Sequence, residues 1–348
     1  MKIDAYNSRK LSVLSFLMIV AVLYIHSFYN EAMGYPAASF VQSFVGNGGL
    51  TIVAVPLFYV MSGFLFFQGV TKIQECLPKI RKRLRTLFIP YLLWNMIFVL
   101  WYVALQNLPG IGGFINSDIV GDIFGGSFSN ALFELFVAPA SFPLWFLRDL
   151  IIIVLFSPLL YLAIRYGKWI TIIVLFLIMP FVLKQTELFN QFGLAYFALG
   201  GCIALHSSLE KMNQVLNNPV FVISVIVYIG HAFMLACGVR PNFVYLGEIS
   251  VVAAIISVWK GYDLIVSRCN HFTSLNSILG YSFFIYLFHE PVFNIIKKIG
   301  LKVLGVHEWS LIVLYLINPI IMCALAIAVA KVIQKYLPKV YGVLVGGR

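Results

Sequence analysis

The sequence predicts an all-α polytopic membrane protein with about ten transmembrane helices. Hydrophobic residues make up 61% of the 348 positions and charged residues only 11%, whereas a soluble domain carries roughly 25% charged residues. The apolar stretches are long and unbroken, which favours helices over the short alternating strands of an outer-membrane barrel. Most Lys and Arg residues lie between these stretches, as in multi-pass membrane proteins.

Ten apolar stretches approach or exceed the length of about 20 residues that spans a bilayer. They cover residues 11–29, 48–69, 84–106, 144–164, 169–184, 189–206, 219–238, 243–259, 277–297 and 310–334. The first follows a basic segment and has no small-residue cleavage site, so we interpret it as a retained helix rather than a signal peptide. The fifth and sixth are the shortest. We expect residues 1–348 to form one transmembrane domain.

The distribution of Lys and Arg predicts which ends of the helices face the cytoplasm. With ten spans and both termini cytoplasmic, 18 of the 24 basic residues fall in inner segments. The two longest outer loops, at about 30–47 and 107–143, contain no Lys or Arg. We therefore expect a multi-pass protein of the cytoplasmic (inner) membrane. Its net charge of +11 is attributed to anchoring at anionic membrane lipids rather than to nucleic-acid binding.

The extracytoplasmic loop at about 107–143 is rich in Gly, Ser and Asn and contains three acidic residues. It is longer than an ordinary connection between helices, and loops of this length are commonly functional. A lid or substrate-binding role and a plain flexible connection both fit this composition.

Ionisable side chains on three predicted helices fall at a similar depth in the membrane. The helical rise of about 1.5 Å per residue puts His26 roughly 23 Å and His289 roughly 18 Å from the inner surface. By the same rise, Arg148 and Asp149 lie roughly 8 Å below the outer surface. All four are therefore in the outer half of a core about 30 Å thick. Titratable groups inside a bilayer are usually functional, so we take this level, which Glu290 shares, as a candidate active site.

These residue types suit acyl transfer, although structural roles are also open. A neutral His26 imidazole could act as a general base on a hydroxyl that attacks an acyl carbon. Arg148 could orient an anionic group or stabilise an oxyanion. Alternatively, Arg148 and Asp149 could neutralise each other, residues 289–291 could form a helix kink, and His26 could be a buried structural histidine.

A basic cluster precedes the third predicted helix on the inner face. Six cations lie between the second and third helices, which exceeds what orientation requires. Guanidinium groups engage phosphates bidentately, so Arg81, Arg83 and Arg85 are candidate phosphate ligands. An ordinary positive-inside anchor also explains the cluster.

Other patterns in the chain argue against several classes of site. The five cysteines are scattered and support neither a disulfide framework nor a zinc site, so we expect no metal. The sequence has no Ser-His-Asp spacing and no Gly-rich phosphate loop, which leaves a nucleotide hydrolase without support. The small residues Ser62 and Gly63 on the second helix favour close helix packing.

Five segments of the chain match one family, in the family's order. They are residues 11–27, which end in Tyr-Ile-His-Ser, residues 55–65 (Val-Pro-Leu-Phe-Tyr-Val-Met-Ser-Gly-Phe-Leu), residues 81–91, residues 143–148, and residues 279–291, which end in Tyr-Leu-Phe-His-Glu-Pro. These segments span almost the whole chain. They resemble the bacterial integral-membrane acyltransferases often called acyltransferase 3, which include polysaccharide O-acetylases.

The resemblance implies transfer of an acyl group, commonly acetyl, from cytoplasmic acyl-CoA to an acceptor hydroxyl on a cell-surface glycan or lipid-linked sugar. It also implies a ten-helix core with both termini inside. By the same resemblance, His26 matches the family's essential histidine. We expect it to act as the general base, with Arg148 or His289 supporting it. The basic run at 81–85 matches the family's arginine segment, so Arg81, Arg83 and Arg85 would hold the CoA phosphates. Acyl-CoA would then be a co-substrate rather than a bound cofactor.

One position departs from the family, and other function classes remain open. The family usually places an Arg eleven residues before the histidine, where this chain has Ser15. A transporter or flippase for an amphiphile also suits polar groups and Pro-containing helices near the midplane. A membrane sensor or scaffold is a third hypothesis. Dependence on acyl-CoA separates the first two, because a transporter should neither need nor hydrolyse it.

Overall fold

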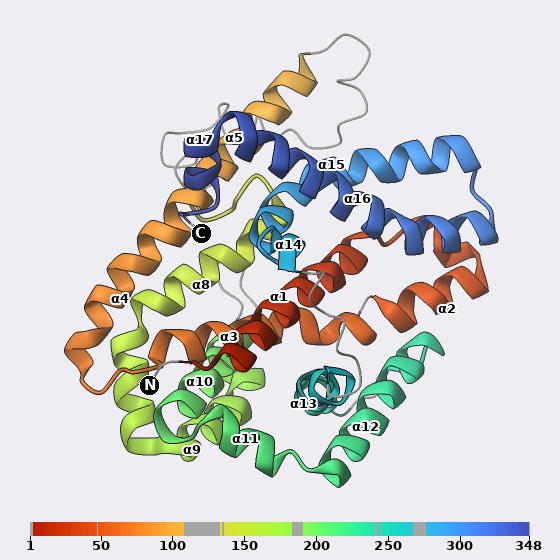
Figure 1. The fold of residues 1–348 in the computed structure, drawn as a ribbon. Coiled ribbons are helices and arrows are strands. Elements are labelled where there is room, and N and C mark those ends of the chain that lie inside the picture. The colour runs from red at the N-terminus through yellow and green to blue at the C-terminus, as the bar shows by residue number, and fades with distance from the viewer. Residues whose placement is uncertain are drawn as a thin grey trace.

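The computed structural model describes residues 3–46, 48–107, 133, 136–182, 191–240, 243, 245–266 and 276–347. Within these residues every regular element is a helix, and the helices pack around α1, which crosses the middle of the bundle (Figure 1). They are α1 (Ala5–His26), η1 (Asn30–Gly34), α2 (Pro36–Val45), η2 (Leu50–Val53), α3 (Ala54–Phe67), η3 (Ile73–Glu75), α4 (Cys76–Arg83), η4 (Leu84–Phe88), α5 (Ile89–Gln106), η6 (Phe142–Leu144), α8 (Trp145–Leu155), α9 (Ser157–Val182), α10 (Gln191–His206), α11 (Leu209–Val215), α12 (Asn218–Ala236), α13 (Leu246–Val266), α14 (Asn276–Leu279), α15 (Ser282–Leu304), α16 (Glu308–Tyr336) and α17 (Pro338–Leu344).

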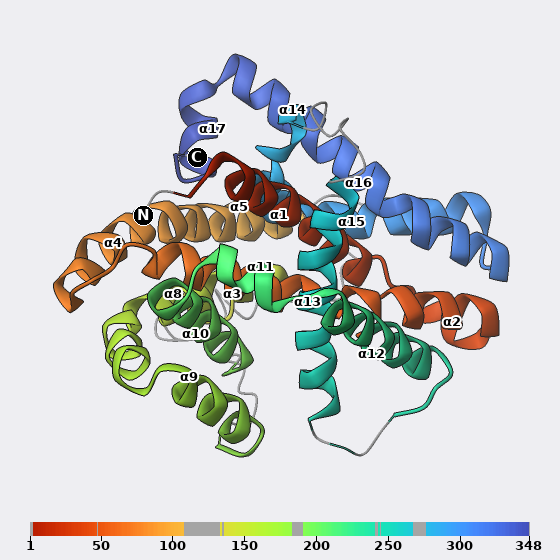
Figure 2. The same ribbon diagram turned by 60° about the horizontal axis from the view of Figure 1, so that its bottom comes forward.

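The described helices confirm a multi-pass membrane protein. Seven segments are long and apolar enough to cross a membrane, or eight if the bent pair α10 and α11 is counted as one span. The total of ten spans stays a prediction. The start of α1 and the short helix α17 lie on the same side of the molecule in both views (Figure 2). The cytoplasmic placement of that side also stays a prediction.

The expected continuous helix over residues 144–164 was wrong. Helix α8 ends at Leu155, and α9 begins at Ser157. The break lies at Phe156, two residues before Pro158. Proline has no backbone N–H to continue the hydrogen bonds of α8, but it is tolerated in the first turn of a new helix. Helix α9 then turns at Lys168, where the backbone is non-helical, so residues 169–182 of the predicted stretch 169–184 form the second part of the same element, and the last two lie outside the described residues.

Glycines bring α3 and α10 into backbone contact. A Cβ atom on Gly63 would overlap the carbonyl oxygen of Phe197, and one on Gly200 would overlap the carbonyl oxygen of Val60. Only glycine permits this approach, and small residues commonly line the contacts of membrane helices. The packing role that the sequence suggested for Gly63 is confirmed.

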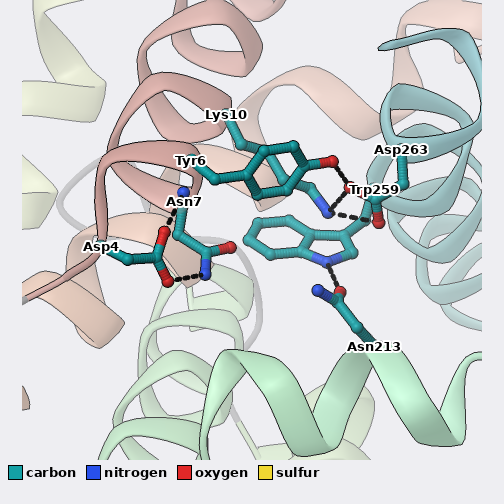
Figure 3. Close-up of polar contacts among 7 residues, drawn as sticks. All are labelled: Asp4, Tyr6, Asn7, Lys10, Asn213, Trp259 and Asp263. Atoms are coloured by element: carbon teal, nitrogen blue, oxygen red, sulfur yellow. Dashed lines mark hydrogen bonds and ion pairs between the residues drawn. The ribbon is translucent and has the colours of Figure 1, made fainter. Parts of the chain in front are cut away.

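A polar cluster around the buried Lys10 connects the start of α1 to α13 and α11 (Figure 3). The Lys10 ammonium lies 2.8 and 2.9 Å from the two carboxylate oxygens of Asp263 and 3.9 Å from the centre of the Trp259 ring. Tyr6 donates its hydroxyl to the same carboxylate at 2.5 Å, and the Trp259 indole donates to Asn213 at 2.9 Å. Lys10 is fully buried. The cluster therefore holds together three helices that are distant in sequence.

Replacing Lys10 with alanine should strongly destabilise the protein. Removing one partner of a buried ion pair leaves the other charge uncompensated, which costs about 3 kcal/mol or more. Thermal unfolding in detergent measures the loss. Lys335→Ala is the matched control, because this lysine also faces an aromatic ring, Tyr336, but on the exposed surface. Equal melting temperatures for the two variants would show that the Lys10–Asp263 pair does not stabilise the fold.

Candidate active site

A cavity of about 650 Å³ lies between α1, α3, α4, η4, η6, α8 and α15. Most of its lining side chains are apolar. The lining residues are Ser15, Ile19, Val22, Ile25, His26, Val55, Phe58, Met61, Ser62, Leu65, Arg83, Leu87, Phe142, Pro143, Trp145, Phe146, Leu147, Arg148, Leu150, Ser282, Phe283 and Tyr286. The cavity thus joins a residue of the predicted phosphate cluster to two residues of the predicted catalytic level.

Helix α1 sets the length of this cavity. Ser15, Ile19, Val22 and His26 follow one another at intervals of four, three and four residues, which places them on one face of the helix. At a rise of about 1.5 Å per residue, Ser15 and His26 are separated by roughly 16 Å. The cavity therefore extends along much of the membrane-embedded part of α1.

Arg83 is brought to the cavity by the packing of α4 against the end of α3. The Lys79 ammonium donates to the carbonyl oxygens of Phe66 at 2.7 Å and Gln68 at 2.5 Å, where α3 ends. Arg83 lies one helical turn beyond Lys79 and lines the cavity as a half-buried side chain.

Arg81 and Arg85 are exposed, and neither lines the cavity. Residues two apart on a helix point about 200° away from each other, so Arg83 must face away from its two neighbours. The structure brings one of the three predicted phosphate ligands to the cavity. Phosphate binding by all three stays a prediction.

The other end of the cavity brings His26 and His289 together. The centres of their rings lie 5.0 Å apart. His289 is fully buried, and its Nδ1 donates to the carbonyl oxygen of Tyr286 at 2.7 Å, which leaves Nε2 without a proton. That Nε2 has no hydrogen-bond partner among the described residues. His26 lines the cavity, whereas His289 packs behind it.

Arg148 pairs with Asp149, which is one of the two alternatives that the sequence left open. Its Nε donates to Asp149 at 2.9 Å, and one terminal nitrogen donates to the carbonyl oxygen of Val137 at 2.5 Å. The pair with Asp149 neutralises both charges in the protein interior. Arg148 also lines the cavity, and a role toward a ligand stays a prediction.

Glu290 is the site residue whose role sequence reasoning missed. Its Oε1 lies 3.7 Å from His26 Nδ1, and its Oε2 accepts a hydrogen bond from Asn294 at 2.7 Å. The predicted kink is present: the backbone is non-helical at Glu290, immediately before Pro291. The sequence placed Glu290 at the right depth, but its orientation toward His26 depends on this kink. A carboxylate beside one imidazole nitrogen can fix the orientation and tautomer of the ring.

A lysine of α15 also contacts the end of α1 beside His26. The Lys297 ammonium donates to the carbonyl oxygen of His26 at 3.1 Å, which ties the second half of α15 to the end of α1.

Among the described residues, no group of three or more His, Cys, Asp or Glu side chains could hold a metal ion. Most of the predicted lid at 107–143 lies outside the described residues, so its role stays a prediction.

Comparisons with known proteins place this chain in a family. The family model described as Acyltransferase domain matches residues 10–333. The chain is 25% identical over 365 residues to the succinoglycan biosynthesis protein ExoH of Rhizobium meliloti (strain 1021), an alignment that covers 99% of this chain and 94% of the relative. No solved structure matches. Because the family match covers nearly the whole chain and every part of the cavity, the protein belongs to the acyltransferase 3 family and is a membrane acyltransferase.

Proposed function

We propose that the protein transfers an acyl group, commonly acetyl in this family, from cytoplasmic acyl-CoA to a hydroxyl of an extracytoplasmic glycan or lipid-linked sugar. The observation that carries the proposal is the single cavity lined by both Arg83 and His26. The similarity to a succinoglycan biosynthesis protein supports a polysaccharide acceptor. The distribution of Lys and Arg supports a cytoplasmic donor side at Arg83 and an outer acceptor side at His26.

The donor enters from the end of the cavity at Arg83. The guanidinium of Arg83 pairs with the CoA phosphates, and the exposed Arg81 and Arg85 add positive charge at the entrance. The pantetheine arm then follows the face of α1 that carries Ser15, Ile19 and Val22. This path brings the thioester to His26 while the nucleotide stays on the cytoplasmic side.

His26 acts as the general base. Its Nδ1 faces Glu290, so Nε2 takes the proton of the acceptor hydroxyl as the hydroxyl oxygen attacks the thioester carbon. The carbon–sulfur bond breaks, and the imidazolium returns the proton to the leaving CoA thiolate. Arg148 stabilises the negative charge that develops on the carbonyl oxygen. His289 packs against the His26 ring and limits its movement.

Turnover of labelled acetyl-CoA by the purified protein tests this function. We expect release of CoA that depends on an added glycan acceptor, together with label in the glycan. Binding of labelled acetyl-CoA to the protein in detergent gives a second measurement that needs no acceptor. A protein that neither binds nor consumes acyl-CoA, yet moves a glycan or amphiphile across proteoliposomes, would instead be a transporter.

A further inference from the structure

Hydroxyl groups from two helices face the cavity between Arg83 and His26. Ser15 of α1 and Ser62 of α3 both line it. The Ser15 oxygen lies 4.0 Å from the sulfur of Met61, the residue next to Ser62, so the two helices meet at this level. Their neighbours along the cavity wall on these helices, including Ile19 and Leu65, are apolar.

The two hydroxyls offer complementary hydrogen-bonding groups to a ligand. Ser15 donates its proton to the carbonyl oxygen of Leu11 at 2.7 Å, so toward the cavity its oxygen acts as an acceptor. Ser62 is half-buried, and its hydroxyl can donate as well as accept. A ligand at this level can therefore donate to Ser15 and accept from Ser62.

An amide group matches this pair, because it carries one donor and one acceptor. An amide that enters an apolar cavity loses its hydrogen bonds to water, and these must be replaced by the protein. Between its phosphate and its thioester, the pantetheine arm of CoA consists of apolar segments joined by amides. The cavity has a matching order of groups: the cation Arg83 for the phosphate, an apolar wall with the two serine hydroxyls for the arm and its amides, and His26 at the thioester.

We propose that Ser15 and Ser62 form a binding site for the amide groups of the pantetheine arm of acyl-CoA. This inference rests on the proposed function, since it assigns the path of the same donor. The site selects donors by their arm, whereas Arg83 recognises the phosphates at the end of the cavity. A thioester without the pantetheine amides would lose these contacts.

Binding of CoA and of adenosine 3′-phosphate 5′-diphosphate, which keeps the three phosphates of CoA but lacks the arm, tests the assignment. We expect the wild-type protein to bind CoA more tightly than this nucleotide. Loss of one hydrogen bond corresponds to about a fivefold change in affinity, so Ser15→Ala and Ser62→Ala should each weaken CoA binding by about that factor. Neither variant should change the affinity for the nucleotide without the arm. Ser62→Leu, which fills the cavity, should reduce CoA binding to the level of that nucleotide.

Ser12→Ala is the matched control for Ser15→Ala. Ser12 also lies on α1 and donates to the carbonyl oxygen four residues earlier, that of Ser8 at 3.1 Å, but its side chain is exposed. It should bind CoA as the wild type does. Melting temperatures of all variants separate a loss of folding from a loss of contact, and the alanine variants keep the assignment testable if Ser62→Leu does not fold.

Two results would overturn the assignment of the serines, and they differ in what they mean for the proposed function. If CoA binds no more tightly than adenosine 3′-phosphate 5′-diphosphate, or if both alanine variants bind CoA normally, the arm does not contact these serines, although CoA-dependent transfer would still support the proposed function. If the protein binds neither compound and releases no CoA from acyl-CoA, the assignment and the proposed function fail together.

Discussion

Replacing His26 with alanine is expected to reduce acyl transfer by about 10²–10⁴-fold, the usual contribution of a general base. The acceptor hydroxyl would lose the group that takes its proton, while the cation that holds the donor stays in place. Arg83 lines the same cavity but belongs to a different element. We therefore expect CoA affinity close to that of the wild type. Mass spectrometry of the acylated glycan and the rate of CoA release measure the two effects separately.

His206→Ala is the control for the loss of a histidine elsewhere in the bundle. His206 ends α10 and makes a hydrogen bond of 2.8 Å with the carbonyl oxygen of Ile164, away from the lining of the cavity. Its replacement should leave transfer unchanged. Full transfer activity in His26→Ala would rule out the proposed mechanism, whatever the result for His206.

The sequence predicted the depth of the polar groups but not the direction in which they point. Counting residues from the helix ends was enough to expect His26, Arg148 and His289 at one level, and the structure brings the two histidine rings within 5.0 Å. The orientation of Glu290 could not be predicted, because it follows from a break in α15 and from the hydrogen bond to Asn294. Their catalytic roles remain predictions.

Charges near the predicted inner ends of the helices show a second limit of prediction from the sequence. Lys10 counted toward the cytoplasmic orientation of α1, yet it is fully buried against Asp263, which is 253 residues away. A count of Lys and Arg treats every lysine near a helix end alike. It cannot recognise a buried lysine, because the acidic partner of such a lysine lies far away in the sequence. By contrast, the break between α8 and α9 had a local signal in Pro158, which the length of the apolar stretch outweighed.

The position of Ser15 in the structure bears on its departure from the family pattern. In the sequence it marked only a missing arginine. In the fold it lines the cavity, on the same face of α1 as His26. Helix α1 contributes no Lys or Arg to the lining, and the two arginines that line the cavity are Arg83 of α4 and Arg148 of α8. In the proposed donor path, the cation of the basic cluster is therefore Arg83 rather than a residue of α1.

Arg83→Ala should therefore weaken donor binding more than any other single change in the basic cluster. A hydrogen bond to a charged group contributes about 1.5–3 kcal/mol, so we expect CoA affinity to fall roughly ten- to hundredfold. Arg81→Ala and Arg85→Ala are matched controls from the same cluster. Both side chains are exposed, where charge pairs contribute little, so each should change CoA affinity by about threefold or less.

The kinetic pattern distinguishes the proposed donor path from its alternatives. Arg83→Ala should raise the KM for acyl-CoA with little change in kcat, because the guanidinium binds a part of the donor that does not react. Arg83→Lys, which keeps the charge but loses the planar fork, should have an intermediate KM. Equal effects of all three alanine variants would mean that the phosphates bind on the exposed surface of the cluster. A normal KM in Arg83→Ala would mean that the donor reaches His26 by another route, because this arginine is the only basic side chain that the described residues of the cluster contribute to the cavity.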